Sequence, residues 1–213
     1  MAFKWTLLLI ISAVCQLAWA QHYDLFDTYH EDSSAEFFLG IGPYHHRPHS
    51  DYVEAATGFA MTVGGSYNRH YFDVDIDLGF GGRCQKDIYQ TRGIIYQGER
   101  VVQLGLSTQY GRIIRRWDRM ELIPFVLMGV KGYNGGEVFD EYYDEDSEDN
   151  YVAKAGFSLG IGICTDFIIV NNKKGDFNQR LRLKPYACLS HYGHDMKYVP
   201  SFNIAVQWIF NGH

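Results

Sequence analysis

The sequence predicts an all-β protein: an eight-stranded, antiparallel, up-and-down β-barrel that spans a membrane. Three observations predict this fold. Apolar and polar residues alternate with a period of two along most of the chain, glycines gather on the polar side of that alternation, and aromatic residues are plentiful, with 16 Tyr, 14 Phe and 4 Trp among 213 residues. With 46% hydrophobic and 21% charged residues, the composition is that of a folded chain rather than a disordered one.

The first twenty residues have the pattern of a secretory signal peptide. Lys4 precedes an almost wholly apolar run over residues 6–17, and Ala18 and Ala20 are small residues where a signal peptidase cleaves. The run is shorter than the ~20 residues that a spanning helix needs. We therefore expect residues 1–20 to be removed and residues 21–213 to form the barrel domain.

The clearest strand covers residues 72–80, where apolar side chains alternate strictly with Asp73, Asp75 and Asp77. A half-buried strand produces this pattern and a helix does not. The same alternation predicts strands, in chain order, over residues 36–42, 58–64, 72–80, 102–109, 153–164, 181–190 and 201–210. Residues 122–133 are apolar on both faces and are expected to add a strand, although Pro124 lies within it. The total is about eight strands, an even number that suits an up-and-down barrel.

The polar side of the strands is expected to face the interior. It is rich in glycine, which weakens an exposed strand but makes room inside a narrow barrel. These glycines are Gly40, Gly42, Gly58, Gly64, Gly105, Gly111, Gly156, Gly160 and Gly162. The apolar side would then meet lipid. The rival interpretation is a soluble secreted barrel of the lipocalin kind, which would have an apolar lumen and glycines outside.

Aromatic girdles are expected at the two membrane interfaces, where the strands end. The candidates are Tyr67, Tyr71, Tyr110, Trp117, Tyr133, Tyr151, Tyr198 and Trp208. For any one of them, a plain surface tyrosine or tryptophan is the alternative.

Charges of both signs occupy inward positions and roughly balance. An unpaired charge in a narrow, poorly hydrated lumen is costly, so we expect an internal salt-bridge network. Its predicted members are Glu36, Asp73, Asp75, Asp77, Lys131, Lys154, Arg182 and Lys184. A catalytic set of the three aspartates is the less favoured interpretation, because one barrel face produces their spacing anyway.

A tight turn is predicted at Asn68 and Arg69. Thr62 and Asp75 both point inward, which requires an even number of residues between their strands, and a two-residue turn satisfies it. With a periplasmic N-terminus, the long connections over residues 43–54, 83–99 and 134–150 would face the outside. The short link over residues 113–117 would join strands on the periplasmic side.

Cys164 and Cys188 are both expected to point inward on consecutive strands. A turn centred near residues 175–176 would place them opposite each other, within reach of a disulfide in an oxidising compartment. Two separate buried thiols are an equally good interpretation. Cys84 would remain in an outer loop.

Two outer loops carry potential metal ligands. Residues 134–150 hold eight acidic side chains, which could gather Ca²⁺ or Mg²⁺ but match no EF-hand spacing. His45, His46 and His49 could hold Zn²⁺ or Cu²⁺, but they lack the fixed spacing of a strand or helix site. A solvated loop is the simpler interpretation of each, and we expect no cofactor.

One group of residues suggests an enzyme. Ser190, His191, His194 and Asp195 bring a hydroxyl, imidazoles and a carboxylate close together in sequence, a combination that can support acyl hydrolysis or transfer on lipid. Neighbours on a strand point to opposite faces, however, so Ser190 and His191 are poorly placed to share a proton. The sequence therefore favours a protein that is not an enzyme.

The formal net charge of −6 and the absence of a Lys/Arg-rich block exclude a nucleic-acid partner. The predicted last strand, residues 202–210, alternates and ends on Phe210. It resembles the C-terminal signal of the small outer-membrane β-barrel proteins of Gram-negative bacteria, the Ail/OmpX-like and OmpA-barrel-like group. It departs from that pattern because Asn211, Gly212 and His213 follow the aromatic residue.

The resemblance covers nearly all of residues 21–213. It implies an outer-membrane location, contact with outer-membrane lipid and lipopolysaccharide, insertion by the outer-membrane machinery, and outer loops that serve envelope integrity, adhesion or binding of an extracellular ligand. A narrow, porin-like solute channel is the alternative function, and a lipid-modifying outer-membrane enzyme is the less favoured one.

Overall fold

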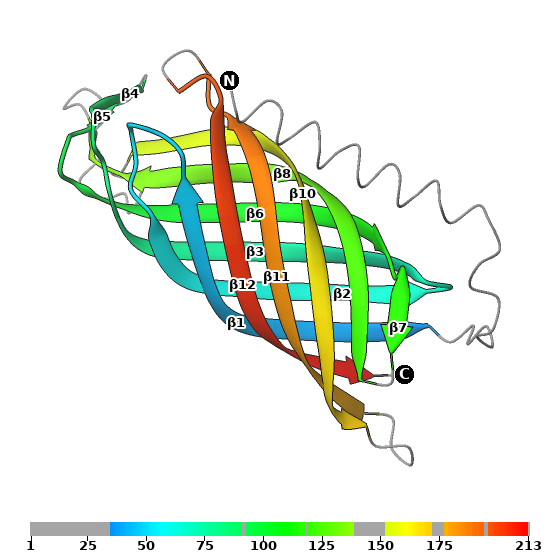
Figure 1. The fold of residues 1–213 in the computed structure, drawn as a ribbon. Coiled ribbons are helices and arrows are strands. Elements are labelled where there is room, and N and C mark those ends of the chain that lie inside the picture. The colour runs from blue at the N-terminus through cyan, green and yellow to red at the C-terminus, as the bar shows by residue number, and fades with distance from the viewer. Residues whose placement is uncertain are drawn as a thin grey trace. The chain divides into compact units, whose positions relative to one another are not determined.

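The computed structural model describes residues 35–90, 93–117, 119–138, 152–171, 177–193 and 196–212. They form a closed antiparallel barrel in up-and-down order (Figure 1). Its strands are β1 (Glu36–Pro48), β2 (Ala56–Tyr67), β3 (His70–Arg83), β6 (Arg100–Arg112), β8 (Met120–Gly135), β10 (Val152–Asn171), β11 (Phe177–His191) and β12 (Val199–Gly212). The β1–β12 and β8–β10 pairings complete the closure, and the predicted eight-stranded barrel is confirmed.

Four short strands add to this barrel. A small separate sheet contains β4 (Ile88–Gln90), β5 (Gly93–Ile95) and β9 (Glu137–Val138). The fourth strand, β7 (Arg115–Trp117), pairs with β8. Within the described ranges, no helix is long and apolar enough to cross a membrane. The signal peptide predicted for residues 1–20 lies outside the described residues.

The predicted two-residue turn joins β2 to β3. Asn68 and Arg69 have φ values of 47° and 67°, and Tyr67 pairs with His70 on either side of them. Two successive residues with positive φ are the signature of a type I′ hairpin turn, whose twist matches that of the strands. We call this end of the barrel the turn end. The opposite end, where residues 49–55 join β1 to β2, we call the loop end.

Pro124 lies in β8 at a break in the ladder on one side of that strand. The β6–β8 ladder ends at the pair Gly111 and Phe125, and the β7–β8 ladder begins at Arg115 and Leu122. A proline has no N–H to donate, so it is tolerated in a strand where the neighbouring ladder is interrupted. The break between β6 and β7 explains how β8 accommodates it.

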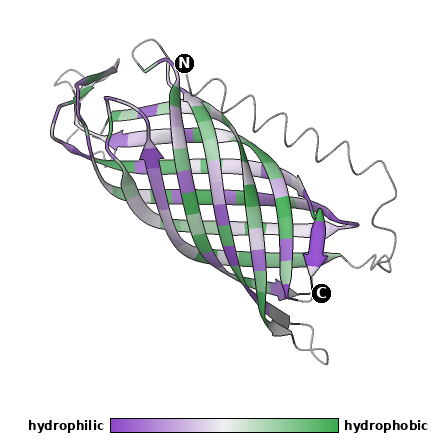
Figure 2. Cartoon of the chain, viewed as in Figure 1, coloured by the Kyte–Doolittle hydropathy of each residue, from purple (hydrophilic) through white to green (hydrophobic). Residues whose placement is uncertain are grey.

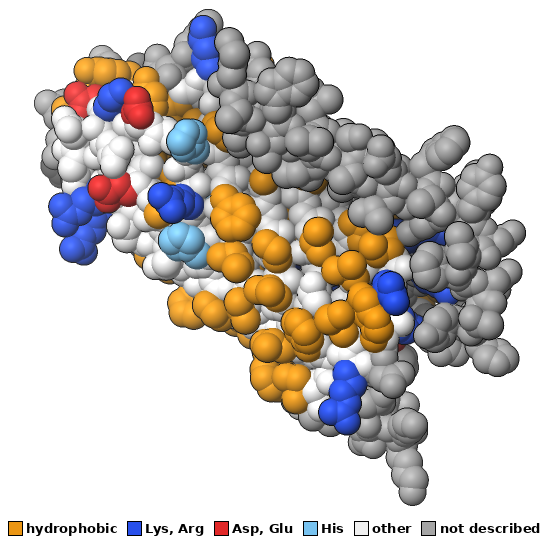
Figure 3. Space-filling view, viewed as in Figure 1, with side chains coloured by type: hydrophobic (Ala, Val, Ile, Leu, Met, Phe, Trp, Pro, Cys, Tyr) orange, Lys and Arg blue, Asp and Glu red, His pale blue; other side chains and the backbone are white. Residues whose placement is uncertain are grey.

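The outside of the barrel is apolar and the inside is polar. Large apolar side chains point outward along the strands, as in Phe37, Leu39 and Ile41 of β1, which are 70%, 50% and 48% exposed. They form a band across the face shown in Figure 3, and the hydropathy colours alternate along the long barrel strands in Figure 2. Asp73 and Asp75 are buried inside. The lipocalin-like interpretation, with an apolar lumen, is therefore wrong.

The predicted aromatic positions divide into two groups. Side chains are exposed at Tyr67, Tyr110, Trp117, Tyr198 and Trp208. Tyr71 and Tyr133 are buried in the lumen, so a girdle position was the wrong prediction for them. The reason for Tyr71 is strand parity: it is adjacent to the outward Phe72 and must point to the other face. Tyr151 lies outside the described residues.

Candidate functional site

Two strands that face each other across the barrel, β3 and β11, supply most of the charged side chains of the acidic and basic rows in the lumen. From β11, the path round the sheet to β3 passes β12, β1 and β2 in one direction and β10, β8 and β6 in the other, so the two strands are diametrically opposed. Inward positions of β3 carry aspartate and those of β11 carry cations, at every second residue. We call Asp73, Asp75 and Asp77 the acidic ladder and Arg180, Arg182 and Lys184 the basic ladder.

The two ladders meet at Lys184. Its Nζ donates hydrogen bonds to Asp73 Oδ2 at 2.9 Å and to Asp75 Oδ2 at 2.7 Å, and all three side chains are within 2% of complete burial. Asp75 also accepts hydrogen bonds from Thr62 Oγ1 and Gln109 Nε2. The ion pair therefore ties opposite walls of the barrel together, and neutral donors support the carboxylate.

Arg182 forms the next level toward the turn end. Its Nε and Nη2 each lie 2.7 Å from an oxygen of Asp166, a bidentate pair between neighbouring strands. Its Nη1 donates to the Tyr71 hydroxyl at 2.6 Å, which in turn donates to Asp73. The guanidinium carbon also lies 4.5 Å from the centroid of the Phe38 ring. Charge-assisted bidentate pairs of this kind are among the stronger hydrogen bonds in proteins.

Arg180 closes the ladder at the turn end. Its Nη2 lies 2.8 Å from Glu36 Oε2 and its Nη1 lies 2.7 Å from Glu121 Oε2. Arg116 Nε, from β7, lies 2.6 Å from the other oxygen of Glu121. Four strands are thus linked where the barrel ends.

The loop half of the lumen is built differently, around the amide of Asn203. Its Oδ1 accepts hydrogen bonds from Tyr44 OH at 2.8 Å, from His46 Nδ1 at 2.7 Å and from Lys131 Nζ at 3.1 Å. Its Nδ2 lies 3.4 Å from Cys188 Sγ. Among the described residues, the polar contacts of Lys131 are with neutral groups, namely Asn203 and the Tyr44 hydroxyl at 3.4 Å.

Asp77 stands between the two halves. Tyr186 OH donates to Asp77 Oδ2 at 2.8 Å, and Lys131 Nζ lies 5.1 Å from the centroid of the Tyr186 ring. Asp77 and Lys131 occupy one row of the sheet with Gly105 between them. Tyr186 thus contacts the carboxylate through its hydroxyl and the ammonium through its ring, and the described ion pairs do not include one between Asp77 and Lys131.

A cluster of buried apolar residues lies at the loop end. Its members are Val53, Cys84, Ile88, Ile95, Val101, Tyr133, Val152, Tyr192, Met196 and Val199. Cys84 Sγ donates to Lys86 O at 2.8 Å. Burial raises the pKa of the Cys84 thiol above its ordinary value. We call this cluster the apolar plug.

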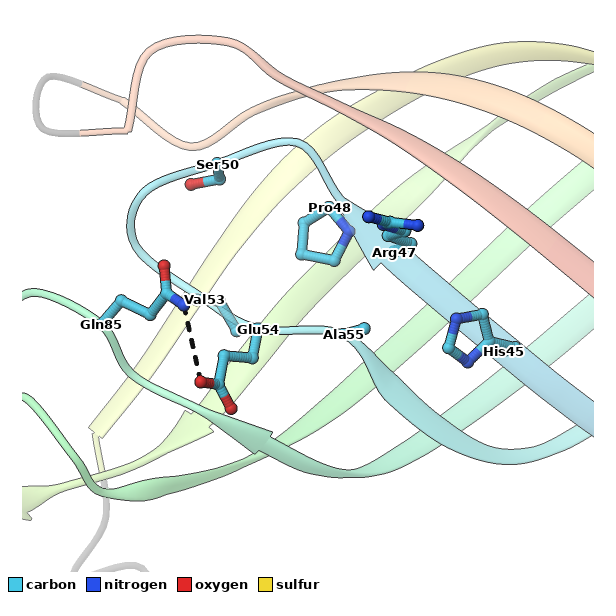
Figure 4. A pocket seen from close by; sticks show the side chains of 8 residues that line it. All are labelled: His45, Arg47, Pro48, Ser50, Val53, Glu54, Ala55 and Gln85. Carbon is cyan, nitrogen blue, oxygen red and sulfur yellow. Dashed lines mark hydrogen bonds between the residues drawn. The ribbon is translucent and has the colours of Figure 1, made fainter.

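A surface pocket of about 370 Å³ lies beside the loop end (Figure 4). It is lined by His45, Arg47, Pro48, Ser50, Val53, Glu54, Ala55 and Gln85. His45 and Arg47 come from β1, whereas Glu54, from the β1–β2 loop, accepts a long hydrogen bond of 3.5 Å from Gln85 Nε2. The pocket therefore offers both a cationic and an anionic wall.

Most of the residues predicted for the lumen network lie in the lumen. Asp73, Asp75, Arg182 and Lys184 are joined by ion pairs, and Glu36 pairs with Arg180. Lys131 and Asp77 are buried, but among the described residues neither forms an ion pair within 4.0 Å. Lys154 is half-buried, and the described ion pairs do not include it.

The sequence interpretation missed Arg180, Glu121 and Asp166. The signal for two of them was strand parity: Arg180 lies two residues before Arg182, and Asp166 lies two residues after the inward Cys164. They were missed because their strands extend beyond the stretches with clear hydrophobic alternation.

The predicted pairing of Cys164 with Cys188 is wrong. Cys188 lies opposite Gly160 in the β10–β11 ladder, and both cysteines are free thiols. The hairpin joins Asn171 to Asn178, so its centre lies earlier than predicted, and an irregularity between Ile168 and Val170 shifts the register further. Of the two interpretations, separate buried thiols agree with the structure.

The histidine cluster is divided by the strand. His45 and His46 lie in β1 rather than in a loop, because β1 continues to Pro48. His46 is buried inside, 1% exposed, while His45 and His49 are outside it. No group of three His, Cys, Asp or Glu suited to a metal ion occurs in the described part of the chain. Residues 139–150, most of the acidic loop, lie outside the described residues.

Ser190 and His191 point to opposite faces, as strand parity predicts. Ser190 is buried, with its Oγ 2.6 Å from Ser158 Oγ. His191 is exposed and its Nδ1 donates to Lys197 O. The structure thus separates the hydroxyl from the imidazole. His194 and Asp195 lie outside the described residues.

Comparisons with known proteins give structural similarities only. No family model and no curated protein matches the sequence. Ail, the attachment invasion locus protein of Yersinia pestis, is 13% identical, with a TM-score of 0.43, covering 83% of this chain and 99% of Ail. Neisserial surface protein A is 12% identical, with a TM-score of 0.42, covering 84% of this chain and 98% of that protein. The outer membrane protein OprG from Pseudomonas aeruginosa is 12% identical, with a TM-score of 0.41, covering 85% and 97% of the two chains.

Proposed function

We propose that this chain is an integral outer-membrane β-barrel protein of a Gram-negative cell, non-enzymatic, whose loop end serves adhesion, envelope integrity or binding of an extracellular partner. The observation that carries the proposal is that the barrel is apolar outside and polar inside, the opposite of a soluble protein. Large apolar side chains cover the outside, while buried aspartates and cations fill the inside. Lipid stabilises such an exterior and water does not, and a closed barrel leaves no unpaired strand edge in the bilayer.

The filled lumen favours a binding or structural role over a wide pore. Lys184 ties opposite walls together near the middle of the barrel, and Arg180 links strands at the turn end. The apolar plug packs buried side chains together at the loop end. An eight-stranded barrel has an interior that side chains alone can fill. Solute passage would require several of these contacts to open at once.

The loop end offers the surface for a partner. It carries the small sheet of β4, β5 and β9, and the pocket with Arg47 and Glu54 on its walls. The tight turn at Asn68 and Arg69 lies at the other end. Short turns of outer-membrane barrels face the periplasm and longer loops face outward, so the proposal places the loop end outside the cell.

The test is fractionation of cells that express the full chain, with heat-modifiability of the electrophoretic band as a second readout. We expect the protein in the outer-membrane fraction, with a mobility shift between unheated and boiled samples. Recovery as a soluble periplasmic or secreted protein would overturn the proposal.

Two further measurements separate the rival functions. We expect planar bilayers containing the purified protein to show no stable conductance steps, whereas a solute channel would produce them. We expect lipid A profiles to be the same in cells expressing the Ser190→Ala variant and the unmodified protein. A lipid modification present with the unmodified protein and lost in the variant would support the enzyme instead.

A further inference from the structure

Exposed arginines gather along one arc of the turn end. They are Arg69, Arg112, Arg115, Arg116 and Arg119. Backbone contacts hold their segments together: Arg69 O accepts a hydrogen bond from Ile113 N at 2.8 Å, Arg112 pairs with His70, and Arg119 O accepts from Ile168 N at 2.9 Å. We call this group the arginine arc.

Arg112 and Arg115 lie directly beyond the apolar exterior. Arg112 has the same strand parity as the exposed Tyr110, two residues away, and is therefore about 7 Å further along the strand. Tyr110 packs on the exposed Phe72, with ring centroids 4.9 Å apart. Arg115 lies with its guanidinium carbon 4.8 Å from the centroid of Trp117. Aromatic residues of this kind are typical of the interface of a bilayer, so in the proposed membrane location these guanidinium groups would lie at headgroup depth.

The arc has an excess of positive charge. Residues 112–119 contain four Arg and one Asp, a formal net charge of +3, in a chain whose net charge is −6. Arg116 is engaged with Glu121 inside the rim. Within the described ranges, Arg69, Arg112, Arg115 and Arg119 form no ion pair within 4.0 Å. The side chains of all four are exposed, so a partner outside the protein can reach them.

We propose that the arginine arc binds the phosphate headgroups of anionic phospholipids, in the leaflet that surrounds the turn end. The inference rests on the proposed membrane location. A guanidinium group donates two parallel hydrogen bonds to a phosphate and stacks on aromatic rings, which suits Arg115 beside Trp117. Basic residues at an anionic membrane surface strengthen association about fivefold each, from about 1 kcal/mol per residue. The leaflet proposed to face the periplasm would thus supply a shell of bound anionic lipid.

The chain provides its own reporters for a test. Its four tryptophans are Trp5, Trp19, Trp117 and Trp208. With Trp5→Phe and Trp19→Phe in the full chain, adding Trp208→Phe leaves Trp117 in the arc, and adding Trp117→Phe leaves Trp208 on β12. Each protein is reconstituted into vesicles of phosphatidylcholine and phosphatidylglycerol in which one lipid or the other is brominated. Quenching of tryptophan fluorescence then gives the relative association of the two lipids at that site.

At Trp117 we expect phosphatidylglycerol to be preferred by about fivefold or more, and the preference to fall with added salt. The Arg112→Gln/Arg115→Gln variant should lower it several-fold. The matched control is Arg83→Gln/Arg100→Gln, which removes two exposed arginines paired with each other near the loop end and should keep the preference. Equal quenching by the two lipids at Trp117 would overturn the inference.

Trp208 separates that failure from a failure of the proposed function. It is 37% exposed on the outside of β12, so brominated phosphatidylcholine should quench it in any inserted barrel. Quenching of Trp208 without lipid preference at Trp117 would reject the lipid site alone. Absence of quenching at Trp208 would reject insertion itself, and with it both proposals.

Discussion

The turn half and the loop half of the lumen are stabilised by different means. In the turn half, Arg180, Arg182 and Lys184 each face carboxylates within 3 Å. In the loop half, Lys131 contacts neutral groups arranged around Asn203. When a buried cation that pairs with a carboxylate is removed, the carboxylate stays buried without a partner. When a buried cation that contacts neutral groups is removed, only those neutral groups lose a contact. The difference teaches that similar buried cations in one barrel should have unequal effects when removed.

The largest expected effect comes from Arg182→Met. The change leaves Asp166 buried without its bidentate partner and removes a donor to Tyr71. Breaking a buried pair in this way costs about 3–5 kcal/mol of unfolding free energy. The measurement is equilibrium urea unfolding in lipid vesicles, followed by tryptophan fluorescence.

The double variant Arg182→Met/Asp166→Leu is its control. Removing both partners leaves no unpaired charge at that pair, so most of the lost stability should return. The exposed Arg83→Met variant should change the free energy by less than about 0.5 kcal/mol. A double variant no more stable than Arg182→Met alone would contradict the idea that the pair is the source of the loss.

Packing gives a second comparison, between the row of Asp75 in the turn half and the row of Asp77 that borders the loop half. Gly129 lies in the row of Asp75, and a Cβ there would stand 2.2 Å from Leu106 O and 2.6 Å from Ser107 Cα. The three atoms nearest to a Cβ on Gly105, in the row of Asp77, would all belong to the side chain of Asp77, at 3.2 Å and beyond. Gly129→Ala should therefore cost about 1–3 kcal/mol, because backbone must move.

Gly105→Ala should cost less than half as much in the same unfolding experiment, since a side chain can shift more easily than backbone. Equal losses in the two variants would show that both rows are packed with equal tightness, against the contacts around these glycines.

Much of the barrel was predictable from the sequence because its physical cause is local. Period-two alternation fixes which residues share a face, and an even turn follows from the inward positions of Thr62 and Asp75. The same parity predicts that Ser190 and His191 separate. The glycines on the polar side correctly predicted that this side faces the interior, because a crowded lumen needs small residues.

The sequence did not predict which residues of strands distant in the chain lie opposite each other. The opposed position of β3 and β11 depends on closure of the whole sheet, so the partners of each lumen charge could not be assigned. The cysteine pairing was wrong because one irregularity in β10 and an earlier hairpin centre move every pair along the ladder. Asp166 and Arg180 were not predicted as lumen residues. A strand is recognised from the alternation of its outward apolar residues, and both residues lie beyond the stretch where that alternation is clear.

Lys131→Met should have a smaller effect than Arg182→Met. It removes hydrogen bonds to Asn203 and Tyr44, and it also removes the cost of burying an ammonium group. We expect the unfolding free energy to change by about 1 kcal/mol or less. Lys131→Met is measured alongside Arg182→Met in the same vesicles. A loss as large as that of Arg182→Met would mean that Lys131 compensates the charge of Asp77 through Tyr186. The buried cations of both halves would then stabilise the barrel by balancing a carboxylate.

The smallest effect is a rate of thiol labelling, and it compares the two ends directly. Cys84 lies in the apolar plug and Cys164 lies in the turn half, both as free thiols. Burial raises the pKa of Cys84, so a smaller fraction is thiolate at neutral pH than in an exposed cysteine. Maleimide labelling of the folded protein should therefore be slow at pH 7 and should accelerate as the pH rises.

Single-cysteine variants assign the signal. With Cys164→Ser and Cys188→Ser, the remaining label in the described region reports Cys84. With Cys84→Ser and Cys188→Ser, it reports Cys164, which should stay unlabelled until urea unfolds the barrel, because it is fully buried beside Asp166. Cys15, outside the described residues, is replaced by Ser in both. Labelling of Cys84 as fast as that of a free thiol at pH 7 would show that the apolar plug opens in the folded state, and the loop half would then be the dynamic half of the molecule.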